Sequence, residues 1–363
     1  MEKYEIGELV EHHKFGLGTV KNIESEEVIT VVFEKCGSKR LMLEFAHLRR
    51  PGTESADTLS PANMASHNWM NDTFVFEDGT TEHYLGSHWN PFYDDSATAL
   101  NRLPEILQKA LLQVSYSDGR PSNQLIPEDW PRAFYLVWPL RVHGLSAVVI
   151  PAKDTNHLVS VFPFDAEGCQ QRLTVEKVHV WQSGVEAQIE CGFGAAKLTF
   201  FDTLYASNRG WYEAGKSCQF ILSGIAYQSR QAEDQILQAW NPKQSEQFRE
   251  LAPEWAADLP DGETMPIHTK GMALFLPINK WDRDDYSFRG PIKSVKEVKI
   301  LDQPCLKARV TVLRDIDNDD RELDIDIIVT RKVWGDAPPP RVGEDMEGAL
   351  WLQGYLWYPE ARP

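Results

Sequence analysis

Two polar clusters contain the residue types best suited to chemistry. The first, EHYLGSHWNPFYDD, contributes His83, His88, Asp94 and Asp95. Imidazole and carboxylate groups are ligands that zinc accepts. The gap between the two histidines fits neither one face of a helix nor a tight turn, so the pattern favours a polar surface loop. A metal-dependent enzyme centred on this cluster, within residues 66–165, is the enzymatic alternative.

The second cluster, DIDNDDRELDID, places Asp315, Asp317 and Asp319 at alternate positions, with Asp326 twelfth from the first. Oxygen ligands at this spacing bind Ca²⁺ in EF-hand loops. However, Asp320 stands where such a loop needs glycine, and the flanking sequences are typical of strands. The pattern therefore favours an acidic hairpin tip that discourages strand pairing with other chains, and calcium binding is the alternative.

Nucleotide chemistry has little support in the sequence. GFGAAK, from Gly192 to Lys197, resembles part of a dinucleotide loop, but it lacks the third glycine and leads into a predicted strand. Dinucleotide binding needs a helix N-terminus at that point. No GxSxG motif occurs in the chain. The spacing GxxxxGK[ST] occurs once, as GWYEAGKS from Gly210 to Ser217, but it leads into the predicted strand CQFILSGIAY and not into a helix. We therefore expect no cofactor and favour a protein without catalytic activity.

The elements that would position the first cluster form a predicted α+β domain over residues 66–165, after a Pro/Ser/Thr-rich linker at 51–65. A helix is predicted because Pro104 suits a first turn and apolar residues follow at helical spacing. These residues are Ile106, Leu107, Ala110, Leu111 and Val114. Strands are predicted around Trp69–Phe76, Glu82–His88, Phe134–Ile150 and Leu158–Phe162.

The second half of the chain reads as a diverged duplication. Three pairs share one offset of 128 residues (343 − 215): Gly215 and Gly343, Leu222 and Leu350, and Tyr227 and Tyr355. Each copy has strands, a short crossover and a closing strand after glycine, which is the order of an OB-type barrel. We predict OB-like barrels at 166–230 and 289–363, joined by an acidic connector at 231–288 that includes a helix over Gln244–Trp255.

OB-type barrels raise the alternative of single-stranded nucleic-acid binding, which combines stacked aromatic rings with basic side chains. Strand alternation places Phe200 and Phe201 on opposite faces, which predicts that one of them is exposed. The candidate nucleic-acid-binding residues are Lys177, Lys197, Phe201, Tyr205 and Trp211. A net charge of −17 argues against coating duplex DNA, because that binding relies on clustered Lys and Arg.

The first fifty residues contain short β-branched stretches separated by turn residues. These stretches are Leu9-Val10, Thr19–Ile23, Val28–Phe33 and Arg40–Leu43. Gly16 and Gly18 come just before a strand, where a bend requires a missing Cβ. About five such strands bury little surface unless they close on themselves, so the pattern predicts a small SH3-like barrel over residues 1–50.

The motif KFGxGTV, a strand ending in VxF, and KRLML after a glycine-containing turn together resemble a Tudor-like domain. This domain occurs in bacterial helicases of the UvrD/PcrA type and in RapA-type RNA-polymerase-associated proteins. The resemblance covers about fifty residues. It implies binding to RNA polymerase or to a DNA repair or defence complex. The implied partner-binding residues are Phe15, Gly16, Gly18, Phe33, Lys39, Arg40 and Phe45, although the phenylalanines also suit a barrel interior.

Composition sets the remaining limits. The 363 residues allow several domains. The absence of a long apolar run or a signal-like N-terminus predicts a cytoplasmic protein that does not contact a membrane. Five cysteines without a CxxC pair predict reduced thiols. The sequence as a whole predicts a mostly β, multi-domain, bacterial adaptor.

Overall fold

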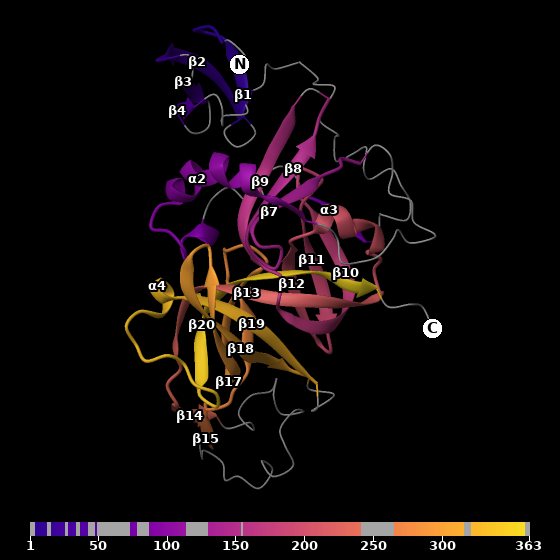
Figure 1. Ribbon diagram of the computed structural model, residues 1–363, viewed down its shortest axis with the longest axis vertical. Helices are drawn as coiled ribbons and strands as arrows, with labels where there is room; N and C mark the ends of the chain where they lie inside the picture. The colour runs from indigo at the N-terminus through magenta and orange to yellow at the C-terminus, as the bar shows by residue number, and fades with distance from the viewer. Residues whose placement is uncertain are drawn as a thin grey trace.

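The structure is a computed structural model in which most of the chain forms β-strands (Figure 1). It describes residues 4–12, 16–25, 28–33, 37–42, 48, 73–77, 87–113, 130–153, 155–240, 265–315 and 321–359. The mostly β fold class is therefore confirmed. No helix among these ranges is long and apolar enough to cross a membrane.

The N-terminal segment forms a four-stranded antiparallel sheet in the order β1-β2-β3-β4. The strands coincide with the predicted β-branched stretches. They are β1 (Leu9–His12), β2 (Gly16–Ile23), β3 (Val28–Phe33) and β4 (Gly37–Met42). Alternation places Val10, Val20, Ile29, Val31 and Phe33 in one small core.

A second antiparallel sheet, β6-β7-β8-β9, belongs to the middle segment. Its strands are β6 (Leu111–Gln113), β7 (Phe134–Pro139), β8 (His143–Pro151) and β9 (Asn156–Asp165). Helix α2 (Ser96–Lys109) packs against this sheet through Leu103 and Ile106, as the amphipathic pattern predicts.

The predicted start of that helix was wrong. Asp95 caps the helix by accepting a hydrogen bond from Ala97 N at 2.9 Å, so Pro104 lies inside the helix and not in its first turn. A side-chain cap satisfies an N-terminal N–H group that proline at N1 would leave without a partner. The predicted strand around Glu82–His88 was also wrong at its described end, where Ser87–Trp89 forms the 3₁₀ turn η1.

The second half of the chain forms two closed rings of five strands that share β13 and β20. The first ring runs β10-β11-β12-β20-β13 and the second runs β17-β18-β19-β13-β20. First-ring elements are β10 (Cys169–Val180), β11 (Ala187–Phe193), β12 (Ala196–Asp202), α3 (Tyr205–Asn208), η2 (Arg209–Trp211) and β13 (Ser217–Gln231). Second-ring elements are β17 (Asp285–Ile300), β18 (Gln303–Arg314), β19 (Glu322–Thr330), α4 (Arg331–Trp334) and β20 (Asp345–Pro359).

The two rings repeat the same order of elements, which supports the predicted duplication. Each has three antiparallel strands, a short helix and a long closing strand. Gly215 and Gly343, at the common offset, both have positive φ, at 81° and 85°. The two segments predicted as OB-like modules thus pair with each other in one sheet (Figure 1), and their assignment to the OB class stays a prediction.

Further strands extend this sheet. β5 (Phe74–Phe76) pairs parallel to β10, and β16 (Leu274–Pro277) pairs with β17. β14 (Ile236–Trp240) and β15 (Met265–His268) form a separate pair. The described part of the connector at 231–288 is therefore extended, not helical, and the helix predicted over Gln244–Trp255 lies outside the described residues.

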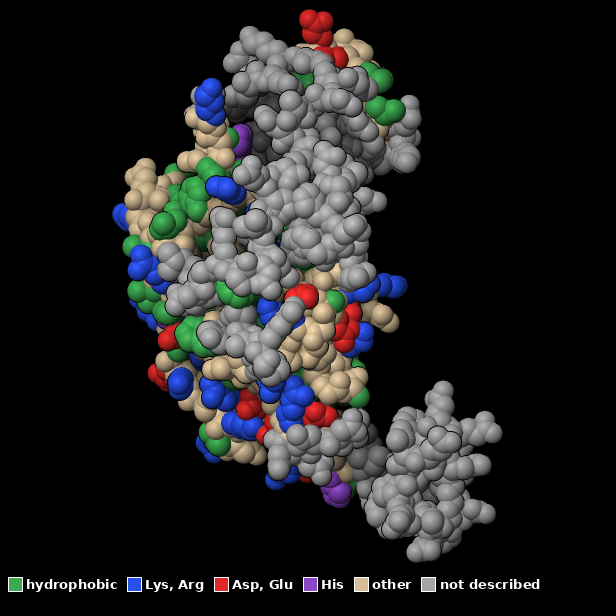
Figure 2. All heavy atoms as spheres, turned by 90° about the vertical axis from the view of Figure 1, so that its right-hand side faces the viewer, with side chains coloured by type: hydrophobic (Ala, Val, Ile, Leu, Met, Phe, Trp, Pro, Cys, Tyr) green, Lys and Arg blue, Asp and Glu red, His purple; other side chains and the backbone are tan. Residues whose placement is uncertain are grey.

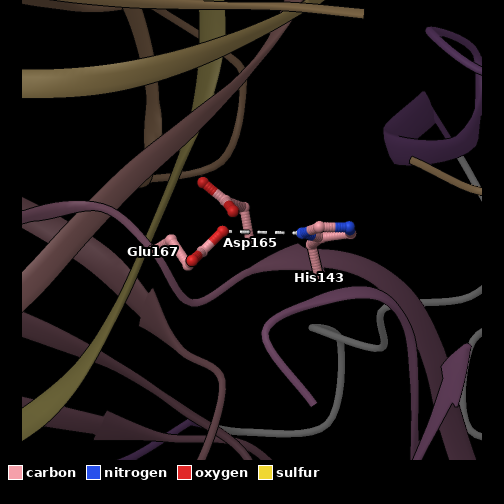
Figure 3. Close-up of side chains that lie close together, drawn as sticks. All are labelled: His143, Asp165 and Glu167. Carbon is pink, nitrogen blue, oxygen red and sulfur yellow. Dashed lines mark ion pairs between the residues drawn. The ribbon is translucent and has the colours of Figure 1, made fainter. Parts of the chain in front are cut away.

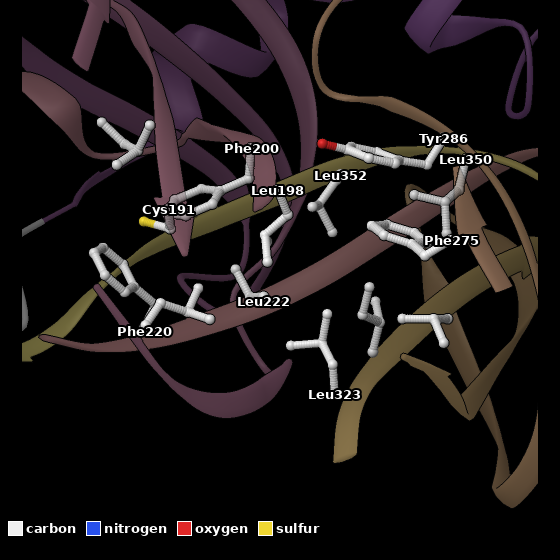
Figure 4. Packing of buried hydrophobic residues seen from close by; sticks show 14 of the residues in the cluster. Cys191, Leu198, Phe200, Phe220, Leu222, Phe275, Tyr286, Leu323, Leu350 and Leu352 are labelled. Atoms are coloured by element: carbon white, nitrogen blue, oxygen red, sulfur yellow. The ribbon is translucent and has the colours of Figure 1, made fainter. Parts of the chain in front are cut away.

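Two hydrophobic cores cover opposite faces of the ring strands. One core is continuous through both rings (Figure 4), from Phe200 and Leu222 in the first to Leu323 and Leu350 in the second. The other core joins the outer face of the rings to the middle sheet and contains Trp351. The cysteines that the structure describes are buried and not disulfide-bonded; they are Cys169, Cys191, Cys218 and Cys305.

The shared strands leave no room for a side chain at Gly354. An added Cβ would lie 2.7 Å from Leu222 Cδ2 and 2.8 Å from Phe200 Cδ2. We predict that Gly354→Ala lowers the free energy of unfolding by about 1–3 kcal/mol, measured by urea denaturation. Gly192→Ala is the matched control, because its nearest new neighbour is the flexible carboxylate of Glu176. Equal stability of the two variants would contradict this packing.

Candidate functional site

Two of the predicted partner-binding residues, Phe33 and Gly18, belong to the core of the N-terminal sheet. Phe33 is 1% exposed and fills the core, so its predicted partner contact was wrong. Gly18 lies beneath that ring: a Cβ there would approach Phe33 Cδ1 to 2.6 Å. Gly18 therefore serves packing, because the missing Cβ lets the Phe33 ring lie close to the backbone of β2.

The outer face of the same sheet is partly apolar. Leu9, Thr19, Val32 and Ser38 are aligned by the strand register and are all exposed. Leu17 lies two residues from Thr19 along β2 and is also exposed. We call Leu9, Leu17, Thr19 and Val32 the outer row. It is an exposed, mainly apolar part of this sheet that other molecules can reach, and the sequence interpretation overlooked it in favour of the phenylalanines.

Three of the other predicted partner-binding residues lie on strands of this sheet. Gly16 opens β2 opposite His12, and Lys39 is partly exposed on β4. Arg40 pairs with Thr30 through the backbone. Phe15 and Phe45 lie outside the described residues.

The aromatic candidates for nucleic-acid stacking are buried. Phe200 and Phe201 do point to opposite faces, but they are 0% and 1% exposed, so the prediction that one is exposed was wrong. The reason is that each face of β12 has its own core, with Phe200 in the ring core and Phe201 against the middle sheet. Tyr205 is also completely buried. Neither Phe201 nor Tyr205 can stack on a base.

The basic candidates do not form a positive surface. Lys197 Nζ forms ion pairs with Glu176 and, at 3.7 Å, with Glu190. Lys177 is exposed on β10 opposite Glu190. Trp211 is partly buried beneath the ammonium group of Lys216. Figure 2 shows acidic and basic side chains intermixed over the described part of one face.

His88 is a core residue and not part of a polar surface loop. It is 5% exposed, and its ring stacks on Trp351 with centroids 3.9 Å apart. His88 Nδ1 lies 2.6 Å from the Tyr227 hydroxyl, which donates to Asp285 Oδ1 at 2.8 Å. Because the hydroxyl gives its one hydrogen to Asp285, Nδ1 of His88 must donate to the tyrosine oxygen. Burial lowers the pKa of His88 to about 3.

The two described aspartates of the first polar cluster have partners other than His88. Asp94 pairs with Lys332 at 2.7 Å, and Asp95 caps α2. His83 lies outside the described residues. The structure thus gives no support to a metal-dependent centre built from these side chains.

The second polar cluster does lie between strands, as the hairpin interpretation predicts. β18 precedes it and β19 follows it in an antiparallel pair. Asp326 binds the guanidinium group of Arg309 at 2.8 Å, and Asp315 lies 3.4 Å from Arg321. Asp317 and Asp319 lie outside the described residues. The two described carboxylates at the ends of the proposed calcium loop are therefore already paired with arginine.

A different group of charged side chains lies where β8 begins and β9 ends in the middle sheet (Figure 3). His143, Asp165 and Glu167 lie together, and His143 Nδ1 is 3.7 Å from Glu167. Lys307 supplies the counter-charge, with its Nζ 2.8 Å from Asp165 Oδ1. Burial raises the pKa of Asp165 and the Lys307 ammonium offsets part of that increase. This group is therefore a buried ion pair that joins β18 to the end of β9.

A third acidic group adjoins His88 and Tyr227. Asp282, Asp284 and Asp285 follow β16, and Asp284 is completely buried. Burial, and then the charge of Asp285, raise the pKa of Asp284 to about 8. Burial raises the pKa of Asp285 to about 6. We did not single out this group from the sequence, although the run KWDRDDY was a visible signal.

A surface groove of about 1130 Å³ opens beside Tyr227. Its charged lining is internally paired: Arg230 and Arg289 both bind Glu347, at 2.6 and 2.8 Å. Lys332, also in the lining, pairs with Asp94. These ion pairs hold the wall of the groove together and leave little net charge there to attract an ionic ligand.

The neutral state of buried His88 predicts acid sensitivity. An unfolded histidine binds a proton below its ordinary pKa of about 6.5, whereas folded His88 does so only near pH 3. The full contribution of neutral His88 to the free energy of unfolding is therefore present above pH 6.5 and decreases as the pH falls. At pH 5 this one residue lowers the free energy of unfolding by about 2 kcal/mol. We predict that His88→Asn, which keeps a donor near Nδ1, loses less stability between pH 7 and pH 5 in urea denaturation. A loss equal to that of the wild type would contradict the buried neutral imidazole.

Comparison with known proteins identifies one segment. Residues 6–50 match the family model of the PcrA/UvrD tudor domain, which confirms the Tudor-like resemblance. No curated protein and no solved structure matches the chain. The N-terminal sheet is therefore similar to the tudor domain of the PcrA/UvrD type, and a domain of this kind suggests protein interaction.

Proposed function

We propose that this protein is an adaptor that binds a large protein partner through the outer row of its tudor domain. RNA polymerase is the leading partner, and a DNA repair or defence complex is the alternative. The match of residues 6–50 to the PcrA/UvrD tudor domain is the observation that carries this proposal.

The exposure of the outer row supports a binding role. Leu9 is 49% exposed and Val32 is 37% exposed, although the sheet has a core on its other face. Apolar side chains aligned across strands offer a flat surface, and their burial contributes about 25 cal/mol per Å² on binding. The row is smaller than a whole interface of about 1,000 Å² or more, so it would form the centre of a larger contact.

The rest of the described chain favours architecture over nucleic-acid binding. Its large aromatic side chains are concentrated in the two cores, and Lys197 is neutralised by carboxylates. Single-strand binding needs exposed rings beside unpaired basic groups. The double ring and the middle sheet would therefore act as a scaffold that carries the tudor domain.

Charge placed on the outer row is expected to abolish partner binding. The full-length chain and a Leu9→Glu/Val32→Glu variant would be used to capture proteins from a bacterial lysate, and then tested against purified RNA polymerase core. We predict at least a tenfold loss of polymerase binding, or about 1.4 kcal/mol, because apolar contact is replaced by buried charge. Both changes are at exposed positions, so thermal unfolding should be little altered.

Leu158→Glu/Leu276→Glu is the matched control, since these leucines are exposed to a similar degree on other sheets. It should capture the same partners as the wild type. Identical partner lists for the outer-row variant and the wild type would rule out the proposed surface. Loss of binding in both variants would show that the effect is not specific to the tudor domain.

A further inference from the structure

The turn between β16 and β17 is held rigidly by the backbone. Asp285 N donates to Asp282 O at 3.1 Å, and Ile278 N donates to Asp285 O at 3.0 Å. Leu352 N, from the shared strand β20, donates to Asp284 O at 2.8 Å. These bonds fix the three aspartates of the turn against the double ring, and Asp285 Oδ2 adds one more by accepting from Asp282 N at 3.3 Å.

The three carboxylates converge. One oxygen from each of Asp282, Asp284 and Asp285 lies within 4.8 Å of the others. Two oxygens bound to one Ca²⁺ at about 2.3–2.6 Å cannot be more than about 5.2 Å apart. The group therefore already has the spacing that a single hard cation requires.

The hydrogen bonds around the group leave an acceptor available. Asp284 Oδ2 accepts from Trp351 Nε1 at 3.0 Å, and Asp285 Oδ1 accepts from Tyr227. Asp284 Oδ1 is completely buried and has no hydrogen-bond partner among the described residues. A buried carboxylate oxygen without a hydrogen-bond partner lowers the stability of the fold unless a proton or a cation binds to it.

A second, independent side chain points to the same place. Gln188, on β11 of the first ring, is 1% exposed, and neither of its side-chain polar atoms meets hydrogen-bond geometry with a described residue. Its amide is nevertheless close enough to Asp284 to favour the charged carboxylate. An amide oxygen is a common ligand of hard cations.

No basic side chain in the described structure forms an ion pair with the group, although the charge of Arg283 lowers the pKa of Asp282 against the larger effect of burial. Arg283 is the nearest in sequence, but its guanidinium group binds Glu77 at 2.6 Å. The comparison with Asp165 is informative, because there Lys307 lies 2.8 Å from the carboxylate and supplies the positive charge. The turn at Asp282–Asp285 has the same kind of buried carboxylate without the lysine.

We propose that Asp282, Asp284 and Asp285 bind one hard divalent cation of the Ca²⁺ or Mn²⁺ class, with the amide oxygen of Gln188 available as a fourth protein ligand. Hard cations prefer such all-oxygen sites, and water molecules complete their coordination. Asp282 is exposed and provides the route of entry. The bound cation would tie the β16–β17 turn to both rings, through Trp351 on β20 and Gln188 on β11.

The experiment uses the full-length protein stripped with EDTA and passed into metal-free buffer. Calcium chloride and manganese chloride are titrated separately at pH 7.5 by isothermal calorimetry, and the melting temperature is followed over the same range. We expect saturable binding of one ion per chain by at least one of the two salts, with a rise in melting temperature as the site fills. Absence of saturable binding with both salts would overturn the proposal.

Three variants test the location. Asp284→Asn is expected to weaken the cation affinity at least tenfold, and Asp282→Asn, at an exposed position that folding tolerates, should weaken it as well. Glu167→Gln is the matched control, because it alters the exposed carboxylate of the group that Lys307 neutralises. Unchanged affinity in Asp282→Asn, or loss in Glu167→Gln, would place the ion elsewhere. None of these results depends on the tudor domain or its partner.

Discussion

The antiparallel pairing of β13 with β20 is the constraint on which the second half of the molecule depends. The register runs from Cys218 opposite Pro359 to Gln231 opposite Met346, so both strands are paired along nearly their whole length. Each strand also pairs with a second neighbour in each ring: β13 with β10 and β19, and β20 with β12 and β17. Neither ring can lose its closing strand without opening the other.

This pairing also explains how the middle sheet is attached. Side chains on one face of the shared strands, such as Leu222 and Leu350, fill the ring core, while Ile225 and Trp351 on the other face contact the middle sheet. Polar groups complete the contact. Gln353 Nε2 donates to Pro163 O at 2.7 Å, and buried polar groups of this kind favour one docking arrangement over slipped alternatives.

Sequence patterns predicted local structure well where one face of a strand meets solvent. In the N-terminal segment, the β-branched stretches predicted the strands, one face of which forms the core with Val10, Val20 and Val31, and the tudor resemblance was confirmed. The rule of strand alternation failed at Phe200 and Phe201, because a strand with a core on each side has no solvent face and its side chains need not alternate in polarity. Pairing between β13 and β20 joins residues more than a hundred positions apart, which periodicity does not report.

The candidate sites show the same contrast between neighbours in sequence and neighbours in the fold. His88 was predicted to lie in a polar surface loop because of its polar neighbours in sequence, but its neighbours in the fold, Trp351 and Tyr227, come from the two shared strands. The large rings of Trp89, Trp181 and Trp351 are all at most 2% exposed, whereas Trp281 and Trp357 are 50% and 40% exposed. A chain whose strands are covered on both faces needs large rings on both, so much of its aromatic content is used by packing. Exposure in the folded chain is therefore better evidence for a contact surface than residue type, and this reasoning shifts attention from Phe33 to the smaller Leu9 and Val32.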